Sequence, residues 1–218
     1  MKKALVCWGG WDGHEPQAVA EHFAALLRGE GFDVQLSDSL SPLEDREATA
    51  ALDLFVPVIT MSTIEPAQLE SILSAVIEHG TGIAGCHGGM CDAFRTEDRW
   101  QFMTGGQWVA HPGDSNVTYT VNLAEPHELT SGMSDFQVTS EQYYLHVDPA
   151  VQVLATTDFP TPGVGGPHIH NPCKMPQVWV KRHGRGRVFY NALGHNRAVF
   201  DIPEATELMR RGFVWAAR

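Results

Sequence analysis

The sequence predicts an α/β protein with an open, mostly parallel sheet that carries helices on both faces. Short apolar runs alternate with amphipathic segments of helical periodicity through the first half of the chain, which is the order that a parallel sheet requires. The length of 218 residues fits one hydrophobic core, since chains usually divide only beyond about 250 residues. Because 43% of the residues are hydrophobic and no linker is visible, we predict a single domain over residues 1–218.

The first half contains the alternating elements. The apolar run 4–8 is short and stops at two glycines, as a buried strand does before a turn. A helix is predicted from Pro16 to Gly29, because Pro suits the first helical turn and the apolar side chains that follow recur on one face. The other elements predicted here are strands at 32–36, 53–59 and 81–85 and a helix over 66–80.

The second half is richer in predicted strands. Residues 159–176 are rich in Pro and Gly, so we expect a long surface loop there, and a last helix is predicted over 201–215. The last two strands below are joined through a Gly-containing turn, which is typical of a β-hairpin. The predicted strands are 117–123, 136–138, 151–155, 178–181 and 187–190.

Charge and composition exclude several classes of function. The chain carries 15 Lys and Arg against 26 Asp and Glu, a net charge of −11, without a basic run, so we expect no binding to nucleic acid or membranes. No segment has the roughly 20 apolar residues needed to cross a bilayer, and the N-terminal segment lacks the apolar stretch of a signal peptide. The 4 cysteines are too sparse for a disulfide scaffold. We therefore predict a cytoplasmic protein.

The strongest local signal is the sequence Gly85-Cys86-His87-Gly88-Gly89 directly after a predicted strand. A sharp strand-to-helix turn needs small residues two positions before and two positions after its apex. His87 has glycine at both positions, whereas Cys86 has Ala84 and Gly88. We therefore expect His87 at the apex. Thiol chemistry at Cys86 and a glycine-rich turn without function stay open as alternatives.

Polar side chains follow other predicted elements as well. His111, Glu141 and His195 each come after a strand-like or glycine-rich segment, so we expect them to meet His87 at the edge where open sheets place their sites. Three imidazoles and a carboxylate suit Zn²⁺ or a similar divalent metal, and the predicted ligands are His87, His111 and His195. The same groups suit metal-free acid–base chemistry, with His87, Glu141 and His195 as catalytic residues.

Four further side chains border the same turns and are the predicted substrate-binding residues. His14 lies just past the first strand, and Tyr143 follows Glu141 by two positions. Trp11 and Trp108 offer aromatic faces that suit a sugar ring. No phosphate loop or dinucleotide fingerprint is present, so we expect no nucleotide cofactor.

Motifs along nearly the whole chain resemble those of the trehalose-utilisation (ThuA-like) family. They are Gly-x-His at 85–87, residues 100–106, His111-Pro112, Pro126-His127, Glu141-x-Tyr143, residues 186–190 and Leu193-Gly194-His195. That family looks like class I glutamine amidotransferases in fold, which implies a flavodoxin-like three-layer sandwich here. It carries His in place of their nucleophilic Cys, and His87 matches that position. The resemblance implies a part in the utilisation of trehalose or a related disaccharide, without glutamine amidotransferase activity.

Three functions are compatible with these residues and this resemblance. The first is a His- and Glu-dependent hydrolase, lyase or isomerase on a keto-sugar or related small carbohydrate, with or without a divalent metal. A keto group acidifies the neighbouring C–H bond, so one general base and one acid suffice for it. The second is a thiol-dependent activity through Cys86. The third is a non-catalytic sugar-binding or regulatory protein on a degenerate amidotransferase fold. The expected partner is a small carbohydrate, and a homo-oligomer is compatible with the sequence.

Overall fold

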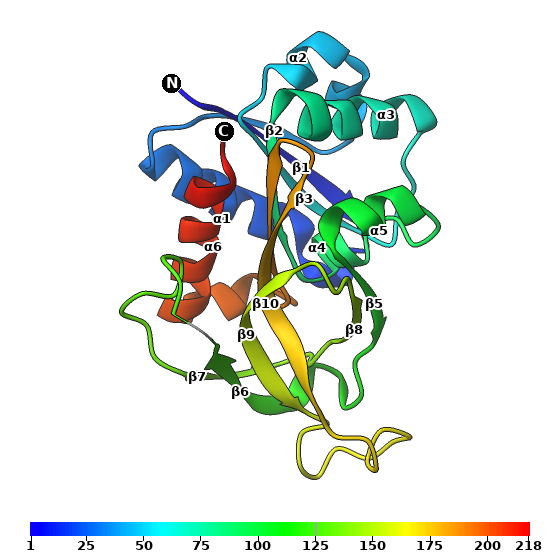
Figure 1. Cartoon of the computed structure of the whole chain (residues 1–218), viewed down its shortest axis with the longest axis vertical. Coiled ribbons are helices and arrows are strands. Elements are labelled where there is room, and N and C mark those ends of the chain that lie inside the picture. Colours follow the sequence, from blue (N-terminus) through cyan, green and yellow to red (C-terminus); the bar gives the residue numbers. More distant parts are fainter. Residues whose placement is uncertain (125) are drawn as a thin grey trace.

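A nine-stranded sheet forms the centre of the computed structural model, which describes residues 1–124 and 126–218 (Figure 1). One half of the sheet is parallel, in the order β2 (Asp33–Ser37), β1 (Lys3–Gly10), β3 (Leu54–Thr60), β4 (Gly82–Cys86) and β11 (Gly186–Asn191). The other half continues antiparallel through β10 (Cys173–His183), β9 (Gln152–Phe159), β6 (Val117–Leu123) and β7 (Phe136–Ser140). The predicted α/β class is confirmed, and so are the parallel strands of the first half.

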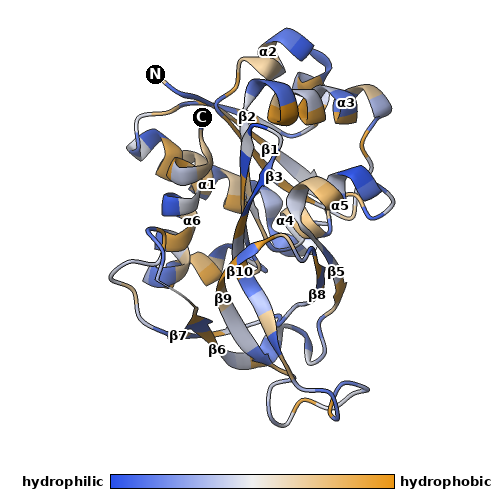
Figure 2. Ribbon diagram, in the orientation of Figure 1, coloured by the Kyte–Doolittle hydropathy of each residue, from blue (hydrophilic) through white to orange (hydrophobic). Residues whose placement is uncertain are grey.

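Helices cover both faces of the parallel strands. Helices α1 (Pro16–Gly29) and α6 (Pro203–Ala216) lie on one face, and α2 (Arg46–Ala50), α3 (Pro66–Ser74), α4 (His87–Cys91) and α5 (Asp98–Thr104) lie on the other (Figure 1). Alternate strand residues enter the two cores: Val6 packs with α1 and α6, whereas Leu5 packs with α3 and α4. Hydrophobic and hydrophilic residues alternate around the helices, as amphipathic helices require (Figure 2).

A second, two-stranded sheet lies beside α4 and α5 and was not expected from the sequence. Its strands are β5 (Gly106–Ala110) and β8 (Tyr144–Val147), which pair antiparallel. Gly106 allows this close approach, because a Cβ atom there would lie 2.7 Å from the Trp179 ring. The small sheet carries Trp108 and adjoins Tyr143, so it forms part of the wall of the site described below.

The predicted surface loop over 159–176 is wrong at both ends. Phe159 closes β9, and residues 173–176 begin β10, where they pair with residues 156–159. The prolines misled the prediction: Pro176 sits beside an irregularity in the strand register, where a missing N–H group disturbs the ladder little. Strands β7 and β9 also extend beyond the predicted ends. The hairpin of β10 and β11 is confirmed, and the predicted helix over 66–80 continues α3 as a π-turn up to His79.

Within the described ranges, no helix combines the length and the apolar character that crossing a bilayer would require.

Candidate functional site

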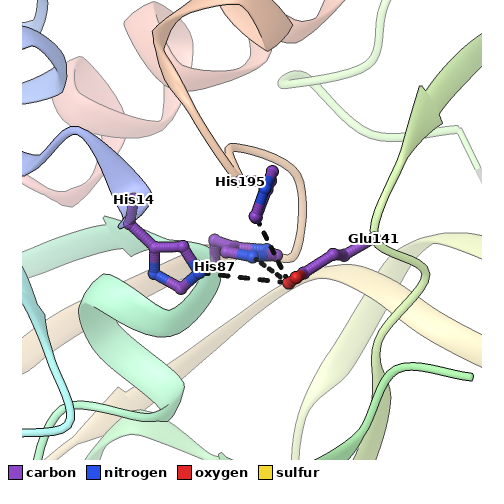
Figure 3. Close-up of side chains that lie close together, drawn as sticks. All are labelled: His14, His87, Glu141 and His195. Carbon is purple, nitrogen blue, oxygen red and sulfur yellow. Dashed lines mark hydrogen bonds and ion pairs between the residues drawn. The ribbon is translucent and has the colours of Figure 1, made fainter. Parts of the chain in front are cut away.

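Four side chains that follow four different strands meet at the C-terminal edge of the parallel strands (Figure 3). His14 follows β1, His87 follows β4, His195 follows β11, and Glu141 enters from the end of β7. Parallel strands end at the same edge, which brings residues far apart in the sequence together. One ligand atom from each of these residues lies within 4.8 Å of all the others. We call this group the His3Glu cluster.

His87 occupies the apex of the turn between β4 and α4, as predicted. Its φ of +47° lies in the left-handed region, and its side chain is buried. Nδ1 lies 2.8 Å from the carbonyl oxygen of Ala192, and Nε2 lies 3.0 Å from Oε2 of Glu141. The ring also stacks on Tyr143, with 3.8 Å between the ring centroids. These contacts fix both the position and the tilt of the imidazole.

The other two imidazoles approach the same carboxylate. His14 makes a 2.9 Å hydrogen bond between Nδ1 and the Thr60 hydroxyl, and its Nε2 lies 3.9 Å from Oε2 of Glu141. His195 Nδ1 lies 3.3 Å from the same oxygen, but it makes no hydrogen bond to any described residue. Figure 3 shows the three rings converging on one end of Glu141. Gly194, with φ of +116°, allows the chain to turn directly before His195.

Backbone strain is concentrated around this edge. Among the described residues outside glycine, positive φ values occur at Glu15, Met61, His87 and Asp114. Glu15 follows His14, Met61 lines the cavity described below, and Oδ1 of Asp114 lies 3.5 Å from Nδ1 of His111. Such conformations cost about 1–3 kcal/mol each and are retained mainly at functional sites. The strain therefore marks the same edge as the polar cluster.

Burial controls the charges in the cluster. It lowers the pKa of His14 to about 3, with a further contribution from the neighbouring His87, against the opposing effect of Glu141. Burial is also the main cause that lowers the pKa of His87. Burial raises the pKa of Glu141, but the contacts with His195 and His87 outweigh it and leave that pKa below its usual value. At neutral pH the arrangement is a carboxylate next to neutral imidazoles at His14 and His87.

A cavity of about 300 Å³ opens onto the cluster. Its size is at the lower end of the range typical of small-molecule sites. The wall combines aromatic, acidic and basic side chains and includes two cluster members. The lining residues are Trp11, His14, Thr60, Met61, Asp92, Arg95, Trp108, His111, Glu141 and Tyr143.

The sequence matches the family model for ThuA, described as trehalose utilisation, over residues 3–216. This chain belongs to the ThuA family. The resemblance seen in the sequence motifs is thereby confirmed. No curated protein matches the sequence.

Solved structures show how widely the ThuA fold recurs. A ThuA-like protein from Bacteroides uniformis has a TM-score of 0.78 at 19% identity, over 99% of this chain and 91% of that one. A cytoplasmic protein from Salmonella typhimurium LT2 has a TM-score of 0.69 at 14% identity, over 100% of both chains. A β-galactosidase from Bacillus circulans sp. alkalophilus has a TM-score of 0.61 at 12% identity, over 99% of this chain and 30% of that one. These likenesses concern the fold alone, and they agree with the predicted flavodoxin-like, class I glutamine amidotransferase-like architecture.

In this ThuA protein, the structure gathers all the nominated side chains but groups them differently. His14, predicted to bind substrate, belongs to the His3Glu cluster. His111, predicted as a metal ligand, lies outside the cluster, with its Nδ1 3.8 Å from the other Glu141 oxygen, Oε1. Trp11, Trp108 and Tyr143 line the cavity, as does His111. The roles assigned to these residues stay predictions.

Sequence reasoning missed four residues of the cavity wall, which are Thr60, Met61, Asp92 and Arg95. Thr60 is the last residue of β3, so the rule that polar residues after parallel strands gather at one edge could have found it. Asp92 and Arg95 come after the five-residue helix α4, and their spacing matches no motif. Only the folded chain places them in the cavity wall.

Cys86 lies outside the cavity. Its thiol is buried among core residues, and burial raises its pKa far above the usual value. A Cβ atom added at Gly194 would lie 2.9 Å from its sulfur atom, so the thiol packs against that turn. A reactive cysteine needs an accessible thiolate, which argues against chemistry at Cys86.

Proposed function

We propose that this ThuA-family protein is a metal-dependent enzyme that hydrolyses, eliminates or isomerises a small carbohydrate. We assign the divalent metal to His14, His87, His195 and Glu141. The carbohydrate follows from the family's description, trehalose utilisation, and from the aromatic residues in the cavity wall. A keto-sugar is the substrate that best suits proton-transfer chemistry, because its carbonyl acidifies the neighbouring C–H bond.

The contact between His87 and Glu141 carries the metal assignment. A carbonyl oxygen only accepts hydrogen bonds, so His87 Nδ1 must donate its proton to Ala192. A neutral ring then directs the lone pair of Nε2 at a carboxylate oxygen 3.0 Å away, which is repulsive. Burial opposes the charged imidazolium that would relieve this repulsion. Coordination of a cation by both His87 and Glu141 would remove this repulsion.

The rest of the cluster fits the same assignment. Three imidazole nitrogens and one carboxylate oxygen suit zinc or another first-row divalent metal. Histidine ligands usually donate the other ring N–H to a nearby oxygen, which fixes the ring. His87 does so with Ala192, and His14 has the Thr60 hydroxyl in the equivalent place. The cluster therefore has a suitable set of metal ligands, and outer hydrogen bonds already orient two of its three imidazoles.

The residues around the cluster supply the remaining chemistry. A divalent ion held by the His3Glu cluster would polarise a carbonyl or hydroxyl oxygen of the substrate. We assign proton transfer to His111, because it lines the cavity outside the cluster and its side chain is 30% exposed. Its proximity to Oε1 of Glu141 orients the ring. Tyr143 holds His87 by stacking and closes the inner wall of the cavity.

Metal analysis of purified, untagged protein tests this assignment. We expect about one equivalent of metal in the wild type, loss of the metal in His14→Gln and His87→Ala, and retention in His111→Gln. Disaccharides and their 3-keto derivatives are then offered as substrates, and His111→Gln should lose turnover with its metal in place. Loss of metal in His111→Gln but not in His14→Gln would contradict the ligand set. Metal and sugar binding without turnover of any substrate would favour the non-catalytic alternative.

The predicted cytoplasmic location, the single domain and a homo-oligomeric state stay predictions. The likeness to a cytoplasmic protein from Salmonella typhimurium is a likeness of fold.

A further inference from the structure

The cavity wall contains an ion pair that none of the proposed chemistry uses. Arg95 donates from Nε and Nη2 to the two carboxylate oxygens of Asp92, at 2.6 and 2.8 Å. Asp92 is buried, whereas the Arg95 side chain is 45% exposed. Both residues line the cavity that opens onto the His3Glu cluster. A buried carboxylate therefore holds a half-exposed guanidinium at the edge of the site.

Trp108 fixes the plane of this guanidinium. The Arg95 Cζ atom lies 4.7 Å from the centroid of the indole ring, in the range of cation–π contacts. A bidentate carboxylate on one edge and an aromatic face beneath leave the group little freedom to rotate. Arg95 is thus held in place before any ligand arrives, which reduces the entropy lost on binding.

The end of the guanidinium formed by Nη1 and Nη2 is free to bind a ligand, as far as the described residues show. Nη1 makes no hydrogen bond to any described residue, and one proton of Nη2 also remains after the contact with Asp92. These N–H groups lie parallel, at a separation that suits two oxygen atoms on adjacent positions of a ligand. Tyr143 lines the same cavity.

We propose that Arg95 is a specificity-determining residue that binds two oxygens on neighbouring carbons of a neutral sugar. This inference rests on the proposed function, because it places the reacting ring in the same cavity. The charge of Arg95 is already balanced by Asp92, so this end of the cavity suits hydroxyl or keto oxygens better than another carboxylate. Trp108 is a positioning residue here: it supports Arg95 with its face.

Arg95→Lys tests this role with the least damage to the fold. Lysine keeps a positive charge for the buried Asp92 but has no planar edge for two oxygens. We would measure binding of methyl α-D-glucoside and its 2-, 3- and 4-deoxy derivatives by calorimetry, with metal content determined in the same samples. Removing a hydrogen bond to a charged group weakens binding by about tenfold or more. We therefore expect Arg95→Lys to bind the parent sugar about tenfold more weakly than the wild type, or weaker still. Its metal content should equal that of the wild type.

The deoxy sugars identify the diol itself. In the wild type, removing one hydroxyl of the bound pair should weaken binding, and in Arg95→Lys the same removal should make little further difference. Trp108→Phe keeps an aromatic platform and should bind better than Trp108→Ala. Equal binding of the parent sugar by the wild type and Arg95→Lys would overturn the role of Arg95. So would an Arg95→Lys substitution that weakens the binding of D-glucuronate more than it weakens the binding of the neutral sugar.

The possible failures are distinguishable. A wild type that binds the sugars with this pattern but holds no metal would refute the metal assignment and leave the role of Arg95 intact. A wild type that binds none of the sugars would overturn both the inference and the carbohydrate assignment. Binding and metal that both persist unchanged in Arg95→Lys would refute only the role of Arg95.

Discussion

Cys86 and His87 are neighbours in the sequence, yet the turn between them sends one side chain into the core and the other into the site. Of the four cysteines, Cys7, Cys86 and Cys91 are buried and Cys173 is exposed. Burial raises the pKa of Cys7 to about 12, and it raises that of Cys86 further still. The residue next to the apex therefore has neither access nor charge for nucleophilic attack.

Iodoacetamide labelling of the folded protein should modify Cys173 alone. Peptide mass spectrometry would locate the label, and turnover or sugar binding would be measured on the same sample. Cys86→Ser should keep most of the activity. Stoichiometric labelling of Cys86 with parallel loss of activity would restore the thiol hypothesis.

Gly88 is the residue whose replacement should disturb the site most directly. A Cβ atom there would lie 2.8 Å from both His14 Cε1 and Thr60 Cγ2, and 3.0 Å from the Tyr143 hydroxyl. Gly88→Ala must push His14 away from the cluster, so we expect at least tenfold weaker metal binding. Overpacking of this kind also costs about 1–3 kcal/mol of stability. Competitive titration with a metal chelator and denaturant unfolding measure the two effects.

Gly29 provides the matched control, because nothing lies within 4 Å of a Cβ atom added at that position. Gly29→Ala should leave metal binding unchanged. Unchanged metal affinity in Gly88→Ala would show that His14 has room to move and is not a tightly held ligand.

At the scale of elements, one ion pair joins the small sheet to the large one. Lys181 on β10 contacts Asp148, directly after β8, at 2.6 Å, and it also donates to the Phe102 carbonyl of α5 at 2.7 Å. Its side chain is only 5% exposed. The pair thus fixes the strands that carry Trp108 and adjoin Tyr143 against β10.

Asp148→Asn should destabilise the protein by about 3 kcal/mol, because it leaves a buried ammonium without its counter-charge. The exposed pair of Lys174 and Asp158 is the control, and Asp158→Asn should change stability by less than about 1 kcal/mol. Urea unfolding of the three proteins measures the difference. Equal stability of the two variants would show that the Lys181 pair does not anchor the small sheet.

The same pair predicts a dependence on pH. The hydrogen bond from Lys181 lowers the pKa of Asp148 below its unfolded value of about 3.9. The Asp148 carboxylate therefore makes its full contribution to the free energy of unfolding above that value. The contribution is lost as the pH falls through the folded pKa. The difference in the free energy of unfolding between the wild type and Asp148→Asn should become smaller below about pH 4. A constant difference at acid pH would contradict this origin.

At the scale of the molecule, the parallel half of the sheet was predictable because its physics is local. Buried strands such as β3 are apolar up to their last residue, and helices such as α1 show one apolar face, so their hydrophobic patterns identify them. The site was partly predictable for a related reason. His14, His87 and His195 follow parallel strands, whose ends must share an edge.

The remaining features depend on contacts between distant segments. Strands β5 and β8 pair across some 35 residues of chain and leave no periodic signal of their own. The choice between His14 and His111 as a cluster member depends on ring orientations set by Thr60 and Glu141. Arg95 enters the cavity wall only through its contacts with Asp92 and Trp108. No spacing in the sequence contains this information.

Anomalous diffraction from crystals of the purified protein, recorded at the absorption edge of the metal found by elemental analysis, tests the central claim most directly. The His3Glu assignment predicts one strong peak about 2.0–2.2 Å from His14 Nε2, His87 Nε2, His195 Nδ1 and an oxygen of Glu141. His111 should lie outside that shell. A peak coordinated by His111 without His14, or an empty site in which His87 and Glu141 keep their 3.0 Å contact after metal has been supplied, would contradict it.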